Sequence, residues 1–280
     1  MTQDELLVQL ELEAQHFSGT FGVMACTLEP NPVDRLEVRF NAEELFPAAS
    51  VIKLPMLIDA LRQVQAGVLK LEDRHVMRPS DHATGSGVLQ VMQAGLEPSL
   101  RDLLALMIVV SDNTATNMTL DILGGVDAIN ARFAASIPDG LGLETTRVLG
   151  KLQVAWELKT PAQRQGKLAE ITPLEMLELL ERIWHGSILE PEMRKLALEI
   201  LEAQQYTEII ARYLPEDLMV ATKSGSITGV RNDVGLVYAP RPYAVALASK
   251  GSSDHREHFD NEGVLVLARV SKLLYDFTQA

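Results

Sequence analysis

The sequence has little cysteine: Cys26 is the only one among 280 residues. No intramolecular disulfide can form, and because Cys26 lies in an apolar run, we expect it to be a small buried residue. The histidines also lack the spacing of metal ligands, such as His-x-x-x-His. The sequence therefore predicts neither a metal site nor another cofactor.

Positive charge is scarce as well. The chain has 25 Lys and Arg against 38 Asp and Glu, which gives a formal net charge of −13 at pH 7. Such a charge repels phosphate backbones and anionic lipids, so neither nucleic acid nor a membrane is expected as a partner. An anionic small substrate would need cations that the site itself supplies.

Long hydrophobic runs are missing, although 47% of the residues are hydrophobic, which is ordinary for a globular protein. The start, residues 1–5, lacks the basic and apolar parts of a secretory signal. As given, the chain is therefore expected in the cytoplasm, whereas a removed leader would imply the periplasm or secretion. We expect a monomer or a weak dimer.

Strand-like patterns occur at both ends of the chain, and helical periodicity fills the middle. We predict an α/β (α+β) fold in which residues 1–47 and 215–280 form an antiparallel sheet flanked by helices, and residues 48–214 form an inserted all-helical domain. The active site is expected in the cleft between them. The predicted strands are residues 19–28, 36–41, 218–222, 234–238 and 243–248.

Ser50 and Lys53 form a Ser-x-x-Lys pair at the start of a predicted helix. Residues three apart share one helix face, so the lysine can accept the hydroxyl proton if its neutral form is favoured. The structural alternative is a helix-capping serine followed by a solvated lysine.

Ser111-Asp112-Asn113 follows an apolar helical run. Ser111 is a candidate for passing a proton to a leaving nitrogen, and Asn113 for binding a substrate amide while it orients Lys53. We expect Asp112 mainly to cap the next helix.

Lys223-Ser224-Gly225-Ser226 follows the predicted strand 218–222. Lys223 is a candidate for binding an anionic group of the substrate and for disfavouring protonation of Lys53. We expect Ser224 to bind substrate as well, and Gly225 to leave room for it. The N–H groups of Ser50 and Ser226 are candidates for an oxyanion hole.

By average residue usage, fewer than about one chain in a hundred carries these three motifs in this order. The set resembles the signature of the class A β-lactamases and related penicillin-recognising serine enzymes. The resemblance extends through residues 85–90, 100–104 and 112–117 and covers most of the chain from about Gly19. It implies the same division into an α/β and a helical domain.

The resemblance is weaker in one region. The family has a glutamate there, with an asparagine soon after it, and these two residues hold the water for deacylation. Glu157 stands near the expected distance before Thr172-Pro173, but the asparagine is missing. Glu157 is either this base or a solvated carboxylate. Arg231 is a candidate for pairing with a substrate carboxylate, or alternatively for bracing Asp233.

These observations predict a serine hydrolase that forms an acyl-enzyme at Ser50 and hydrolyses β-lactams, with Lys53 or a Glu157-bound water as the base. A cytoplasmic esterase or peptidase with the same residues is one alternative. A penicillin-binding protein that deacylates slowly is another. A binding module without turnover is disfavoured, because the lysines are intact and binding alone does not require the whole set of proton-transfer residues.

Overall fold

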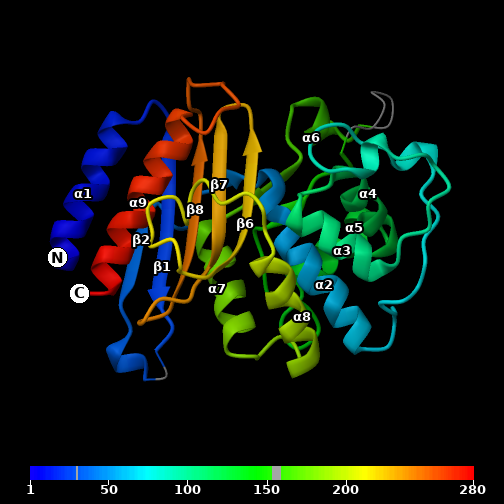
Figure 1. The fold of residues 1–280 in the computed structure, drawn as a ribbon, viewed down its shortest axis with the longest axis horizontal. Coiled ribbons are helices and arrows are strands. Elements are labelled where there is room, and N and C mark those ends of the chain that lie inside the picture. The colour runs from blue at the N-terminus through cyan, green and yellow to red at the C-terminus, as the bar shows by residue number, and fades with distance from the viewer. Residues whose placement is uncertain (30, 153–158) are drawn as a thin grey trace. The chain divides into compact units, whose positions relative to one another are not determined.

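The computed structural model describes residues 1–29, 31–152 and 159–280. These residues divide into two compact units, both drawn in Figure 1. The first unit comprises Met1–Val51, Ile171–His185 and Tyr206–Ala280. The second comprises Ile52–Glu170 and Gly186–Gln205.

The first unit is built on an antiparallel sheet with the strand order β2-β1-β8-β7-β6. Two of its strands come from the start of the chain and three from the end, which confirms the prediction of one sheet made from both termini. Its strands are β1 (Thr20–Thr27), β2 (Glu37–Phe40), β6 (Val220–Ile227), β7 (Val230–Val237) and β8 (Tyr243–Lys250).

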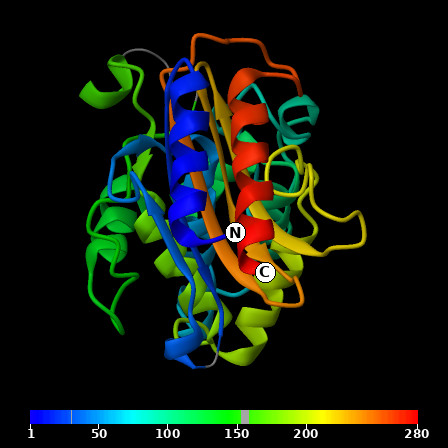
Figure 2. The same ribbon diagram turned by 90° about the vertical axis from the view of Figure 1, so that its left-hand side faces the viewer.

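Helices cover both faces of this sheet. α1 (Gln3–His16) and α9 (Glu262–Thr278) lie side by side on one face, and α7 (Pro173–Trp184) packs against the other (Figures 1 and 2). Every residue of β7 is buried, as expected for a strand covered on both sides.

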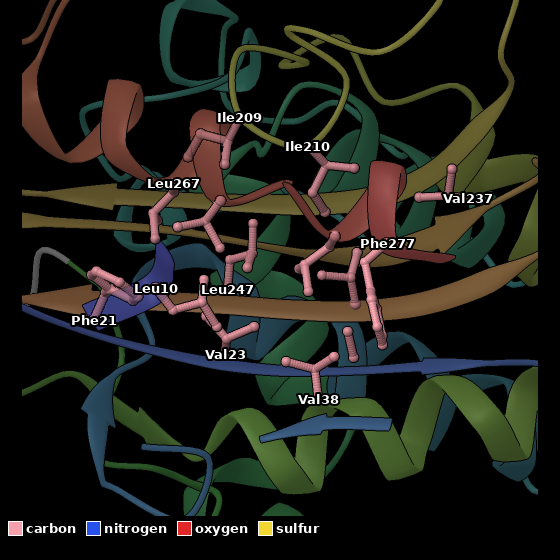
Figure 3. Close-up of a cluster of buried hydrophobic side chains, with 14 of the residues drawn as sticks. Leu10, Phe21, Val23, Val38, Ile209, Ile210, Val237, Leu247, Leu267 and Phe277 are labelled. Carbon is pink, nitrogen blue, oxygen red and sulfur yellow. The ribbon is translucent and has the colours of Figure 1, made fainter. Parts of the chain in front are cut away.

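The core between the sheet and helices α1 and α9 is a cluster of buried apolar side chains (Figure 3). Leu10 comes from α1 and Leu267 from α9, and both meet strand residues such as Val23 and Leu247. Burial of each large apolar side chain contributes about 1.5–3 kcal/mol. This packing makes β7 and its neighbours a firm support for the chemistry described below.

The structure differs from the predicted boundaries at two places. Residues 48–51, 171–185 and 206–214 group with the sheet unit and not with the helical one. α7 buries its apolar stripe against the strands, and Ile209, Ile210 and Leu214 join the core cluster of the sheet. Strand β6 also continues to Ile227, so residues 223–226 lie inside the strand and not after it. Pairing with β7 overrides the low strand propensity of Gly225 here.

The second unit is mainly helical, with α2 (Lys53–Gln65) at its centre. All residues from Lys53 to Leu61 are buried, so α2 is surrounded by other elements. The sequence did not predict the short antiparallel pair of β4 (Arg147–Val148) and β5 (Ala169–Ile171). The other helices are α3 (Leu100–Val109), α4 (Asn113–Ile122), α5 (Gly125–Ala134), α6 (Pro161–Arg164) and α8 (Pro191–Glu202).

The described residues also contain several short elements. The two-residue strand β3 (Phe46–Pro47) and the 3-10 turn η2 (Ala49–Ile52) lead into α2. Three further 3-10 turns are η1 (Pro32–Asp34), η3 (Pro79–Asp81) and η4 (Leu89–Val91). Within the described residues, none of the helices combines the length and the apolar character needed to span a bilayer.

Candidate active site

Ser50 lies in a strained turn. Ala49, just before it, has a φ of 46°, a left-handed conformation that costs a residue with a Cβ atom about 1–2 kcal/mol. The Val51 N–H closes the turn by donating to the Ala48 carbonyl at 3.0 Å. Such strain persists only where the surrounding structure enforces it, and it is concentrated at functional sites.

Lys53 begins α2 and is only 1% exposed. Its Nζ donates to the Ser111 carbonyl at 2.7 Å, to the Ser111 hydroxyl at 3.0 Å and to Asn113 Oδ1 at 2.9 Å. The N-cap position of α2 is held by Ile52. The structure therefore contradicts the alternative of a capping serine followed by a solvated lysine.

Ser111 also has a left-handed backbone, with a φ of 52°. The chain turns there between α3 and α4, and Asp112 caps α4 by accepting the Ala115 N–H at 2.9 Å, as the sequence predicted. Asn113 is then the first residue of α4, and its carboxamide reaches Lys53. The turn thus brings a hydroxyl and an amide to the same ammonium group.

A glycine-containing loop holds this turn from the other side. Asn113 donates its N–H to the Ser86 carbonyl at 3.0 Å and its Nδ2 to the Thr84 carbonyl at 2.9 Å. A Cβ atom on Gly87 would lie 2.3 Å from the Asp112 carboxyl carbon, so only glycine fits. Because Thr84 fixes Nδ2, Oδ1 of Asn113 faces Lys53, and one amide hydrogen is left for a substrate.

The cluster in the second unit is suited to moving a proton. Lys53 and the Ser111 hydroxyl are within hydrogen-bond distance, so a proton can pass between them without rearrangement of the helices. Asn113 can hold a carbonyl oxygen through its remaining amide hydrogen.

The first unit holds the second lysine. Lys223 lies within β6, is fully buried, and donates to the Ser224 carbonyl at 2.6 Å. Burial lowers the pKa of its ammonium group to about 7, although the charge of Asp233 opposes this shift. Burial likewise raises the pKa of the Asp233 carboxyl to about 7. The Ile210 N–H, which donates to Asp233 Oδ2 at 3.1 Å, opposes this rise.

Gly225 is the point where β6 meets the Ser50 turn. A Cβ atom on Gly225 would lie 2.8 Å from the Ser50 nitrogen and 3.0 Å from the Ala48 carbonyl oxygen. The absence of a side chain therefore lets the Ser50 amide sit against the strand. β6 is also the last strand in the sheet order, so one side of its main chain, including the Ser224-Gly225-Ser226 stretch, has no neighbouring strand in this sheet.

The model of the beta-lactamase enzyme family matches residues 6–278. This chain belongs to that family. Beta-lactamases of Streptomyces lavendulae and Rhodobacter capsulatus are each 29% identical to it, over 250 and 230 residues. The alignments cover 86% of this chain and 77% of the first relative, and 81% of this chain and 75% of the second.

Solved structures of the family have the same fold. A beta-lactamase from Sphaerobacter thermophilus superposes with a TM-score of 0.83 and 30% identity, covering 100% of this chain and 98% of that one. A PBP-A mutant in an acyl-enzyme complex with penicillin G superposes with a TM-score of 0.84 and 28% identity, covering 99% and 97%. The chain is a class A serine β-lactamase or PBP-like hydrolase, an enzyme type that acts on a cyclic amide.

Arg231 of this β-lactamase-family chain makes contacts other than those that the sequence suggested. It is 5% exposed, and its guanidinium donates to the carbonyls of Ile227, Val230 and Arg256. Burial lowers its pKa. These contacts favour a structural role in the loop before α9 over a contact with a substrate carboxylate, and they replace the expected brace on Asp233.

Glu157 lies outside the described residues, but the chain on either side of it is described. Asn117 exchanges two hydrogen bonds with the main chain of Leu152, both at 2.9 Å. Thr160 Oγ1 donates to the Leu149 carbonyl at 2.8 Å. Asn117 is one helical turn after Asn113 on α4, so Leu152 is held close to the residues that contact Lys53.

Two parts of this site were missed in the sequence. Residues 85–90 contributed only to the family resemblance, although the paired glycines Gly85 and Gly87 near a motif are a usable signal of close backbone approach. Asn232 was also missed, because its position opposite Gly225 depends on the register of β6 and β7. Periodicity in one sequence does not fix such a register.

Proposed function

We propose that the chain hydrolyses β-lactams through an acyl-enzyme at Ser50. The observation that supports this most is the bonding of buried Lys53 to both Ser111 and Asn113, since this set suits proton transfer. Within the first unit, the close approach of Gly225 to the Ser50 nitrogen supports the proposal as well.

In the first step Ser50 Oγ attacks the lactam carbonyl carbon, and its proton passes to neutral Lys53 or to a water held by Glu157. The N–H groups of Ser50 and Ser226 stabilise the oxyanion. The C–N bond then breaks, and the leaving nitrogen takes a proton through the Ser111 hydroxyl.

Substrate is held by groups on both sides of the reacting bond. Asn113 binds its side-chain amide, and Lys223, with Ser224, binds its carboxylate. Lys223 is a cation in a chain of net charge −13, which meets the requirement that the site supply its own positive charge. Water then attacks the Ser50 ester, with Glu157 as the base, and frees the opened product.

The test uses penicillin G and intact mass measurement. We expect Ser50 to gain the mass of the whole penicillin within one turnover, and the Ser50→Ala variant to gain none. Ser136→Ala, which alters an exposed serine in the other unit, is the matched control and should be acylated like the wild type. Wild-type Ser50 that stays unmodified under saturating penicillin contradicts the proposal.

A penicillin-binding protein with slow deacylation is the second candidate. The structural similarity to PBP-A and the missing asparagine after Glu157 favour it. Nitrocefin separates the candidates: a burst of one equivalent followed by slow release indicates the second. Steady turnover that is lost in Ser50→Ala indicates a β-lactamase. Turnover of simple esters alone indicates the esterase or peptidase.

A further inference from the structure

Asn232 is a fully buried amide beneath the Ser50 turn. It lies on β7, directly opposite Gly225 on β6, so its side chain and the gap left by the glycine face the same side of the sheet. Its Nδ2 donates to two consecutive carbonyls, Pro47 at 2.8 Å and Ala48 at 3.0 Å. Both carbonyls lie just before the strained turn.

The orientation of this amide is fixed from the other side. Oδ1 of Asn232 accepts the N–H of Ser249 on β8 at 2.9 Å. With Oδ1 committed to that donor, both Nδ2 hydrogens point toward the turn. The carboxamide therefore uses the rigid three-strand part of the sheet to hold two successive peptide planes.

These planes determine where the Ser50 amide points. Ala48 is followed by Ala49 in its left-handed conformation and then by the Ser50 nitrogen, which sits 2.8 Å from the ideal Cβ position of Gly225. If the Ala48 carbonyl rotated, the unfavourable φ of Ala49 would relax, and the Ser50 N–H would turn with it.

We propose that Asn232 is a positioning residue for acyl transfer: it holds the turn at residues 47–49 so that the Ser50 N–H is presented to the oxyanion. The inference rests on the proposed acyl-enzyme at Ser50. Asn232 itself touches no substrate in this scheme, because it is buried beneath the turn.

The chain offers a closely matched control in Asn261. That residue is 1% exposed and belongs to the same unit. Its Nδ2 donates to the carbonyls of Asp254 at 2.8 Å and Arg256 at 3.0 Å, and its Oδ1 accepts the Gly263 N–H at 2.9 Å. Asn232→Ala and Asn261→Ala therefore each remove three equivalent hydrogen bonds, one set at the Ser50 turn and one at the start of α9.

The experiment compares both variants for kcat and KM with penicillin G, and for affinity toward a boronic acid that adds to the serine as a tetrahedral adduct. We expect Asn232→Ala to lower kcat by about 100-fold, with a similar loss of boronic acid affinity and a KM within about threefold of wild type. Asn261→Ala should keep all three within about threefold. Equal kinetic losses in the two variants, or unchanged boronic acid affinity in Asn232→Ala, overturn the inference.

Two further measurements keep the result interpretable. If Asn232→Ala does not fold, Asn232→Ser, which keeps one donor, should fold and show an intermediate loss; unchanged kinetics in that variant overturn the inference. NMR of the Ser50 amide tests the positioning without activity, so it separates this inference from the proposed function. A shift of that resonance in the Asn232 variant but not in Asn261→Ala supports the inference even if wild type is not acylated, and an unmoved resonance overturns it.

Discussion

Each unit of the chain carries one buried lysine of the proposed chemistry, and the two lysines have different surroundings. Lys53 in the second unit contacts the Ser111 carbonyl and hydroxyl and the Asn113 amide oxygen. Lys223 in the first unit donates to the Ser224 carbonyl. Burial lowers its pKa to about 7, and the charge of Asp233 opposes this shift. These surroundings fit the proposed roles of Lys53 in proton transfer and of Lys223 in attracting an anion, with a charge that depends on pH.

The largest effect is expected for Lys53→Met. This change removes the proposed base and leaves the Ser111 carbonyl and the Asn113 amide oxygen without their buried donor, which costs about 1–3 kcal/mol of stability. We expect kcat for penicillin G to fall by about 1000-fold. Steady-state kinetics measure this, and thermal unfolding confirms that the variant is folded.

Lys223→Met is the paired variant, since it also replaces a buried lysine by an apolar side chain of similar length. Its main effect should be a higher KM for anionic substrates. A larger loss of kcat in Lys223→Met than in Lys53→Met would reverse the two assignments.

A smaller loss is expected for Gly225→Ala, which introduces a Cβ atom 2.8 Å from the Ser50 nitrogen and 3.0 Å from the Val51 nitrogen. Main-chain atoms cannot move away cheaply, so the turn must shift, and we expect kcat/KM to fall by about 100-fold. Stability should fall by about 1–3 kcal/mol. Kinetics and chemical denaturation give the two values.

Gly87→Ala is the counterpart in the second unit. Gly87 has a φ of 102°, and its Cβ atom would meet the Asp112 side chain and main chain within 2.4 Å. Strain and overlap act together there, so stability should fall more than in Gly225→Ala. If Gly225→Ala keeps full activity, the close approach of β6 to Ser50 has no role in the reaction.

The sequence predicted most of this arrangement because the motifs are local. Ser50 and Lys53 are one turn apart, and Ser111 and Asn113 share one turn between helices. Residues that are close in the sequence within each motif are therefore also close in space. The sheet made from both ends of the chain was also predictable, since period-two patterns are visible within each strand.

Features that depend on pairing between distant segments could not be predicted. The position of Asn232 opposite Gly225 is a property of strand register, and the grouping of α7 with the sheet is a property of what its apolar stripe packs against. The carbonyl partners of Arg231 could not be predicted for the same reason, because they lie as far away as Arg256.

The smallest effect concerns pH and tests the difference between the lysines directly. Lys223 attracts a carboxylate only while protonated, so with its pKa lowered to about 7, kcat/KM for an anionic β-lactam should fall above that pH by up to tenfold per unit. Asp233→Asn removes a negative charge that raises the pKa of Lys223. The alkaline limb should therefore move to lower pH, with kcat/KM at pH 7 reduced by less than about tenfold.

A β-lactam without a carboxylate is the control, because its kcat/KM does not depend on the charge of Lys223 and should lack this limb. The carboxamide introduced by Asp233→Asn would still offer an oxygen to the Ile210 N–H, so the fold around β7 should be retained. An alkaline limb that does not move in Asp233→Asn would mean that the carboxyl of Asp233 is uncharged beside Lys223 in this range, and a limb that moves to higher pH would contradict the prediction. With Asp233 uncharged, burial alone would set the lowered pKa of Lys223, and the contrast with Lys53, which is bonded to Ser111 and Asn113, would be sharper still.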